Sequence, residues 1–180
     1  MTNANVDQIV TGGDIELTES LDITKTMTVG CGGTGVLDYE AYAFIIPTGK
    51  TVSVKSGGSL NNLGSIVNNG TVEDTSAANG VFSGSLASIT NNGTLNIDNI
   101  FLVLEGTLTN NGLIRISAGD GHILLCPGSV ITNNSGGTIN DNGSMNLEVS
   151  TGWDGALYDR GATFTNAGAF NVGSISTPAS

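Results

Sequence analysis

The chain of 180 residues has few basic side chains: five lysines and arginines stand against 16 aspartates and glutamates, for a formal net charge of −11. A nucleic-acid-binding surface needs clustered cationic side chains, so nucleic acid is excluded as a partner. No apolar run approaches the roughly 18 residues that cross a membrane as a helix, so no membrane span is expected. A charge of this size is instead typical of a β-rich surface that must stay soluble.

Cysteine, proline and histidine are scarce as well. The two cysteines, Cys31 and Cys126, are too few for a disulfide scaffold and have no metal-ligand spacing, so no metal site is expected. We interpret them as small buried hydrophobic residues, with a bridge within or between chains as the alternative. Three prolines beside 27 glycines exclude collagen and proline-rich linkers. With 12% charged residues and a slightly positive mean hydropathy, the chain is not disordered.

What the chain does contain is a repeat, seen best in Leu104–Ile116 (LEGTLTNNGLIRI). A glycine opens a short alternating run, an asparagine pair and a second glycine follow, and another alternating run completes the unit. The opening glycines are spaced 26, 22, 22 and 33 residues apart, at Gly58, Gly84, Gly106, Gly128 and Gly161. Spacing in the low twenties with β-type alternation predicts a solenoid in which each repeat is one coil.

Alignment of the residues after the turn glycines predicts the cross-section of a coil. The second residue is always apolar and the third always polar, so stacked coils should carry an apolar column inside and a polar column outside. The apolar positions are Val72, Leu95, Ile114, Ile139 and Phe170, and the polar positions are Glu73, Asn96, Arg115, Asn140 and Asn171.

The asparagine-glycine dipeptides predict the turns of the coils. Both residues tolerate the left-handed backbone region, which allows a sharp bend, and asparagines at one place in successive coils can form a hydrogen-bonded ladder. We assign this role to Asn69, Gly70, Asn92, Gly93, Asn111 and Gly112. The same dipeptide also marks β-hairpins, so an antiparallel sandwich is the alternative.

The first coil is predicted from Asp14, where DIELTESLDITKTMTV places three apolar pairs six residues apart. This stretch resembles the opening coil of right-handed parallel β-helix proteins of the pectate-lyase-like kind. No stretch indicates a helix. We therefore expect an all-β protein, a right-handed parallel β-helix of about seven coils. Its parts are an N-terminal arm or cap at 1–13, the β-solenoid at 14–175 and a C-terminal tail at 176–180.

The repeats also resemble the β-helical shafts of bacterial surface adhesins, haemagglutinin-like exoproteins and phage or viral fibres. The resemblance rests on turns such as Asn68–Thr71 and Asn91–Thr94 and implies a fold rather than an activity. No catalytic motif of enzymes with this fold is present. Asp120 beside His122 is the one place where an acid neighbours the single histidine, and we interpret that histidine as a surface residue. The chain is therefore not expected to be an enzyme, and no cofactor is implied.

A second interpretation rests on the insertion Leu147–Arg160. It contains Trp153, Asp154, Tyr158 and Asp159, and sugars are commonly bound by aromatic stacking together with carboxylate hydrogen bonds. An adhesin or carbohydrate-binding module that recognises surface glycans is thus the alternative, and a polysaccharide-active enzyme is the third hypothesis. For Trp153 itself we favour the opposing interpretation, in which its side chain folds back to cover an apolar edge of the coil stack.

The preferred hypothesis is a self-assembling structural subunit of an extracellular or surface fibre or particle. The repeat continues to Val172 with no capping element after it, and an uncapped coil is an open sheet edge. Head-to-tail stacking of the chain on itself follows, with Gln8, Ile9 and Val10 of the arm added as a strand to a neighbour. The first ten residues lack the basic start and apolar core of a signal peptide, so either export is signal-independent, a signal peptide has been removed, or the protein is packaged inside a cell or particle.

Overall fold

The computed structural model describes residues 8–10, 14–23, 26–29, 36–38, 43–55, 59–62, 64–74, 80–84, 88–97, 100–104, 106–116, 122–125, 128–141, 148–149 and 163–172. The regular structure within these ranges consists of 22 β-strands and contains no helix. Short strands are expected here, because β-branched residues alternate with polar ones and glycine or asparagine ends each run. The prediction of an all-β protein is therefore confirmed for the part of the chain that the structure describes.

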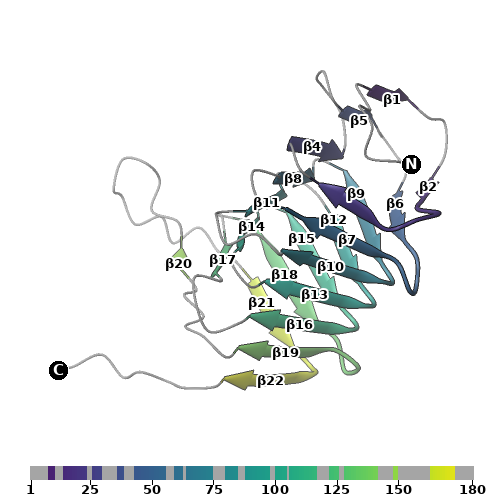
Figure 1. The fold of residues 1–180 in the computed structure, drawn as a ribbon. Coiled ribbons are helices and arrows are strands. Elements are labelled where there is room, and N and C mark those ends of the chain that lie inside the picture. The colour runs from purple at the N-terminus through teal and green to yellow at the C-terminus, as the bar shows by residue number, and fades with distance from the viewer. Residues whose placement is uncertain are drawn as a thin grey trace, which may run out of the picture.

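The strands form three sheets (Figure 1). Sheet A has eight strands, in the spatial order β1 (Gln8–Val10), β5 (Val36–Asp38), β4 (Thr26–Val29), β8 (Ser59–Asn62), β11 (Gly80–Gly84), β14 (Ile100–Leu104), β17 (His122–Leu125) and β20 (Glu148–Val149). Sheet B has seven, in the order β2 (Ile15–Glu16), β6 (Ala43–Ile46), β9 (Ser65–Asn68), β12 (Ser88–Asn91), β15 (Thr107–Asn110), β18 (Val130–Asn133) and β21 (Thr163–Asn166). Sheet C has seven, in the order β3 (Leu21–Ile23), β7 (Thr51–Val54), β10 (Thr71–Asp74), β13 (Thr94–Ile97), β16 (Leu113–Ile116), β19 (Thr138–Asp141) and β22 (Ala169–Val172).

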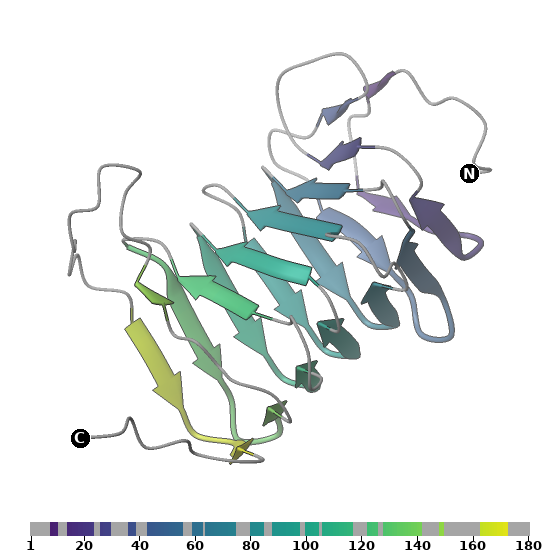
Figure 2. The same ribbon diagram turned by 60° about the vertical axis from the view of Figure 1, so that its left-hand side comes forward.

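From β6 onward the chain visits sheets B, C and A in turn and then begins again one strand further along the stack (Figures 1 and 2). Strand β12, for example, pairs with β9 before it and β15 after it, both in parallel. Every strand pair among the described residues is parallel, so the antiparallel sandwich is excluded. The fold is that of a parallel solenoid. Its handedness and the number of its coils stay predictions.

The core lies between the sheets and consists of apolar columns that run along the stack. In sheet C, the predicted column is in register: Val72 pairs with Leu95, Leu95 with Ile114, and Ile114 with Ile139. Each of these side chains is buried, and Phe170 at the end of the column is partly buried against the others. A second column in sheet B follows the same rule, with the members Phe44, Ile66, Ile89, Leu108 and Ile131.

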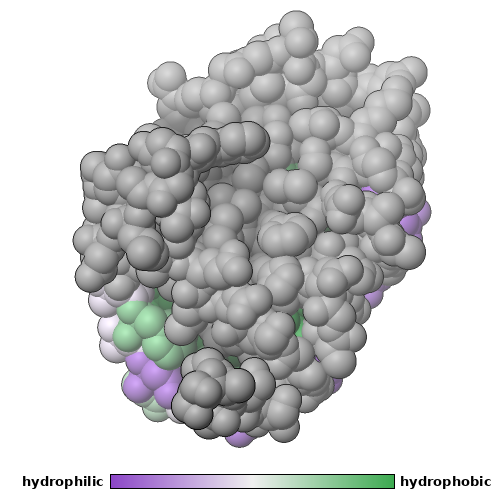
Figure 3. Space-filling model, turned by 90° about the vertical axis from the view of Figure 1, so that its left-hand side faces the viewer, coloured by the Kyte–Doolittle hydropathy of each residue, from purple (hydrophilic) through white to green (hydrophobic). Residues whose placement is uncertain are grey.

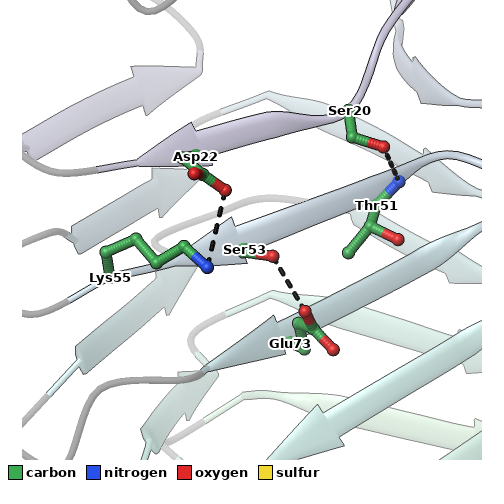
Figure 4. Close-up of polar contacts among 6 residues, drawn as sticks. All are labelled: Ser20, Asp22, Thr51, Ser53, Lys55 and Glu73. Atoms are coloured by element: carbon green, nitrogen blue, oxygen red, sulfur yellow. Dashed lines mark hydrogen bonds and ion pairs between the residues drawn. The ribbon is translucent and has the colours of Figure 1, made fainter.

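The outer face of sheet C carries the predicted polar column, whose members are exposed or half-buried. Figure 4 shows polar contacts near the N-terminal end of this face, among them those of Asp22, Lys55 and Glu73. Ser53 donates a hydrogen bond from its Oγ to Oε1 of Glu73 at 2.8 Å, and Lys55 lies 3.6 Å from Asp22 across one strand step. Arg115 is exposed, and Lys55–Asp22 is the one ion pair within the described ranges. Exposed pairs of this kind contribute at most about 1 kcal/mol, so they shape the charge of this face more than its stability.

Near the N-terminal end, sheet A departs from the simple order. Strand β1 lies within the predicted arm, and β5 pairs both with β1 and with β4. Residues 8–10 are thus paired within their own chain, at the outer edge of the sheet. The division of the chain into arm, solenoid and tail stays a prediction.

Candidate assembly site

A ladder of asparagine side chains runs along the stack at the carboxyl ends of the strands of sheet B. The first asparagine of each pair lies two residues after a core residue of the same strand, so it points into the stack. Successive Nδ2 and Oδ1 atoms lie 2.7 Å apart in every step. The members of this inner ladder are Asn68, Asn91, Asn110, Asn133 and Asn166.

Both amide protons are used in Asn68, Asn91, Asn110 and Asn133. Besides Oδ1 of Asn91, the Nδ2 of Asn68 donates to the backbone oxygen of Thr94 at 2.9 Å. Its own Oδ1 accepts the N–H of Gly70 at 3.1 Å. Asn91, Asn110 and Asn133 repeat the bond to the next strand of sheet C. The inner ladder therefore joins sheets B and C at each coil, and it satisfies polar groups whose burial would otherwise be costly.

The second asparagine of each pair forms an outer ladder, which runs in the opposite direction. Asn92 donates to Oδ1 of Asn69, Asn111 to Asn92, and Asn134 to Asn111, at 2.6–2.8 Å. Donors of the inner ladder point towards the C-terminal end of the stack, whereas those of the outer ladder point towards the N-terminal end. Because the two rows of amide dipoles are antiparallel, their fields oppose each other, and long ladders add no large net dipole.

The turn glycines are required by close packing between coils. A Cβ at Gly93 would overlap the carbonyl oxygen of Gly70, and one at Gly112 would overlap that of Gly93. Among the described glycines, only Gly49 and Gly128 have positive φ, at 78° and 82°. The expectation that Gly70, Gly93 and Gly112 adopt the left-handed region was therefore wrong. These positions need glycine because successive turns stack with their backbones in contact.

Among the described residues, β21 and β22 are the last strands of sheets B and C at the C-terminal end of the stack. Phe164 occupies the core column of sheet B in register with Ile131, yet it is 36% exposed where Ile131 is 0% exposed. Its ring meets that of Phe170 edge-on, with centroids 5.6 Å apart. Asn166, the last member of the inner ladder, is also exposed. In Figure 3, apolar side chains reach the surface near this lower end of the molecule.

The N-terminal end of the stack differs from the C-terminal end in the burial of its apolar side chains and in its charge. Leu17, Leu21 and Ile23 are buried there, although they belong to the first strands of the stack and the turn between them. The surrounding surface is acidic, with exposed Asp14, Glu16, Glu19 and Asp22. The described residues 163–172 at the other end carry no charge. Two such acidic surfaces repel each other, whereas the strands of residues 163–172 add no charge that would repel an N-terminal end.

The structure brings together some of the residues selected from sequence and not others. Asn69, Asn92 and Asn111 form the outer ladder, while Gly70, Gly93 and Gly112 form the column of close contacts. Gln8, Ile9 and Val10 make up β1. The glycan-binding candidates Trp153, Asp154, Tyr158 and Asp159 lie outside the described residues, as do Cys31, Cys126 and Asp120.

The inner ladder is the feature that sequence reasoning missed. Its signal was present in the alternation itself, because Asn68 follows Ile66 by two residues and must share its face. The sequence patterns led us to assign a ladder role to the second asparagine of each pair only, and the first asparagine was given no role.

The described residues hold no group of three histidine, cysteine or acidic side chains that could bind a metal ion. They also contain no helix long and apolar enough to cross a membrane. No protein-family model, no curated protein and no solved structure matches this chain.

Proposed function

We propose that this chain is a structural subunit that assembles head-to-tail into an extracellular or surface fibre or particle. In this proposal, the subunit is a right-handed parallel β-helix of about seven coils, and it acts as a structural component and not as an enzyme. The observation that carries the proposal is the exposure of Phe164, a core residue by register, in a terminal segment, 163–172, that carries no charged side chain.

A neighbour stacked on this end would bury Phe164 and Phe170 and pair with the outer edges of β21 and β22, the terminal strands of their sheets. Terminal strands of parallel sheets offer unpaired backbone groups, which makes them templates for another chain. The acidic N-terminal end favours contact with the neutral end over contact with its own kind. A head-to-tail contact joins two different surfaces, so it leads to a fibre unless the rotation closes a ring. The addition of Gln8–Val10 to a neighbour's sheet stays part of this proposal.

Electron microscopy and sedimentation of the purified protein test the proposal. We expect fibres or short stacks for the natural chain and monomers for Phe164→Lys, because a charge would be placed in the buried contact. The matched control is Thr165→Lys, which adds the same charge to the adjacent, outward-facing residue and should leave assembly intact. A natural chain that stays monomeric at high concentration would refute the proposal, and one that stops at dimers would favour the pairing of two C-terminal ends.

The glycan-binding alternative rests on sequence alone, because its four candidate residues are outside the described ranges. A glycan-binding screen followed by Trp153→Ala would test it. Loss of binding with unchanged stability would favour that function.

A further inference from the structure

The outward side chains of sheet B form a regular grid, which we call the hydroxyl face. Six successive strands, β6, β9, β12, β15, β18 and β21, contribute two outward residues each, and the pairing is in register throughout. All twelve side chains are exposed or half-buried. One column is Ala43, Ser65, Ser88, Thr107, Val130 and Thr163, and the other is Ile45, Val67, Thr90, Thr109, Thr132 and Thr165.

The composition of this face is distinctive. Eight of the twelve residues carry a hydroxyl, the others are aliphatic, and none is charged or aromatic. In a chain with a net charge of −11, six strands free of outward charge form a neutral surface. The outward face of sheet C, by contrast, carries Asp22, Glu73 and Arg115. A ligand of the hydroxyl face should therefore be neutral and able to form hydrogen bonds.

The geometry of the grid restricts the ligand further. Neighbouring strands lie about 4.8 Å apart, and outward residues on one strand repeat after about 6.8 Å. The hydroxyls follow this grid: Oγ of Ser88 donates to Oγ of Ser65 on the next strand at 3.1 Å. A ligand that meets all twelve residues equally must itself repeat in two dimensions with similar periods.

Three occupants can be compared. A second copy of the chain would bury on the order of 300 Å² per partner over six strands spaced about 4.8 Å apart, well below the roughly 800 Å² of a stable interface. A sugar polymer is normally bound by aromatic rings, which this face lacks.

A water lattice meets each requirement. It is neutral, it donates and accepts hydrogen bonds, and the oxygen positions of ordinary ice repeat with periods close to both spacings of the grid. The hydroxyls can form hydrogen bonds with lattice water. The methyl groups of threonine, valine and alanine can fit between water molecules, and unlike a charged side chain they do not orient the surrounding water into a hydration shell. We propose that the hydroxyl face binds ice.

Ice itself is the probe for this proposal. The purified chain should create a gap between the melting and freezing temperatures of a seed crystal and should be enriched in slowly growing ice. Thr132→Lys places a charged chain in the middle of the grid and should reduce both effects several-fold. The matched control is Thr138→Lys, in the next strand of the chain but on sheet C, which should leave them unchanged.

Circular dichroism establishes that each variant is folded, and Thr109→Lys provides a second disruption of the grid if Thr132→Lys does not fold. Absence of a freezing gap and of enrichment in ice for the natural chain would overturn the proposal. So would an equal loss in the sheet B and sheet C variants, or retention of the natural chain by insoluble cellulose or chitin but not by ice. None of these outcomes depends on whether the chain forms fibres.

Discussion

The Nδ2 of Asn91 lies 2.7 Å from Oδ1 of Asn110, and both side chains are 0% exposed. Two buried amides thus satisfy each other across one coil step, and the remaining proton of Asn91 reaches the backbone oxygen of Leu113 at 3.1 Å. Only an amide has a donor and an acceptor arranged for this, because a carboxylate lacks the donor and an aliphatic side chain lacks both. The hydrogen bonds of the inner ladder therefore require asparagine at these positions more strictly than the conformation of the turn does.

This requirement predicts opposite outcomes for two neighbouring residues. Asn91→Asp would place a carboxylate oxygen against Oδ1 of Asn110 and the carbonyl of Leu113, in a site closed to water. We expect a loss of about 3–5 kcal/mol in the free energy of unfolding, the usual cost of an uncompensated buried charge. Asn92→Asp, in the exposed outer ladder, should cost less than about 1 kcal/mol. Urea denaturation of both variants measures the difference, and similar losses would contradict the assignment of inner and outer ladders.

The stacking of turn backbones predicts a second contrast, between two adjacent glycines. A Cβ at Gly137 would collide with Oδ1 of Asn133 and with the backbone oxygen of Asn110. A Cβ at Gly136 would have no neighbouring atom closer than 3.7 Å. Neither glycine has a positive φ. Gly137→Ala should therefore destabilise the chain by roughly 1–3 kcal/mol or more, as overpacking does. Gly136→Ala should be neutral or stabilising by up to about 1 kcal/mol, because it restricts the unfolded chain.

Thermal unfolding followed by circular dichroism compares the two alanine variants directly. If Gly136→Ala proved as damaging as Gly137→Ala, the requirement for glycine would come from backbone conformation, and the steric explanation would fail.

The apolar column of sheet C gives a third prediction. Ile114 is 0% exposed and lies between Leu95 and Ile139, so Ile114→Asp buries an unpaired charge among apolar side chains. We expect this variant not to fold, since such changes cost several kcal/mol. Arg115→Ser alters the exposed neighbour and should change stability by less than about 0.5 kcal/mol. Far-UV circular dichroism would show β-structure for the second variant and its loss for the first.

The parts of the fold that sequence predicted are those controlled by alternation. The column from Val72 to Ile139 and the polar column beside it follow from period two, which fixes the face of every residue once one is assigned. Parallel pairing followed from the likeness of successive repeats. The outer ladder followed from the recurrence of asparagine before each turn glycine.

What sequence did not predict depends on distances between coils. Gly93 lacks a side chain because the backbone of the preceding turn occupies that space, and no local pattern distinguishes this from a left-handed glycine. Strand β5 lies between β1 and β4 in sheet A, out of chain order, which the repeat pattern does not predict. The neutrality of the hydroxyl face became visible only when the outward residues of six strands were placed side by side.

The last prediction concerns the open end and compares two residues of one column. Ile131→Ala removes a side chain that is 0% exposed and should cost about 2–5 kcal/mol at any protein concentration. Phe164→Ala removes a larger side chain that is 36% exposed, so in dilute solution its cost should be smaller than that of Ile131→Ala.

If copies stack on this end, Phe164 becomes buried in the contact, and the stability of the natural chain then rises with concentration. The difference between the natural chain and Phe164→Ala should therefore widen as concentration increases, while the difference for Ile131→Ala stays constant. Melting curves across a wide concentration range measure both, and a Phe164→Ala difference that does not change with concentration would show that this end is not an assembly surface.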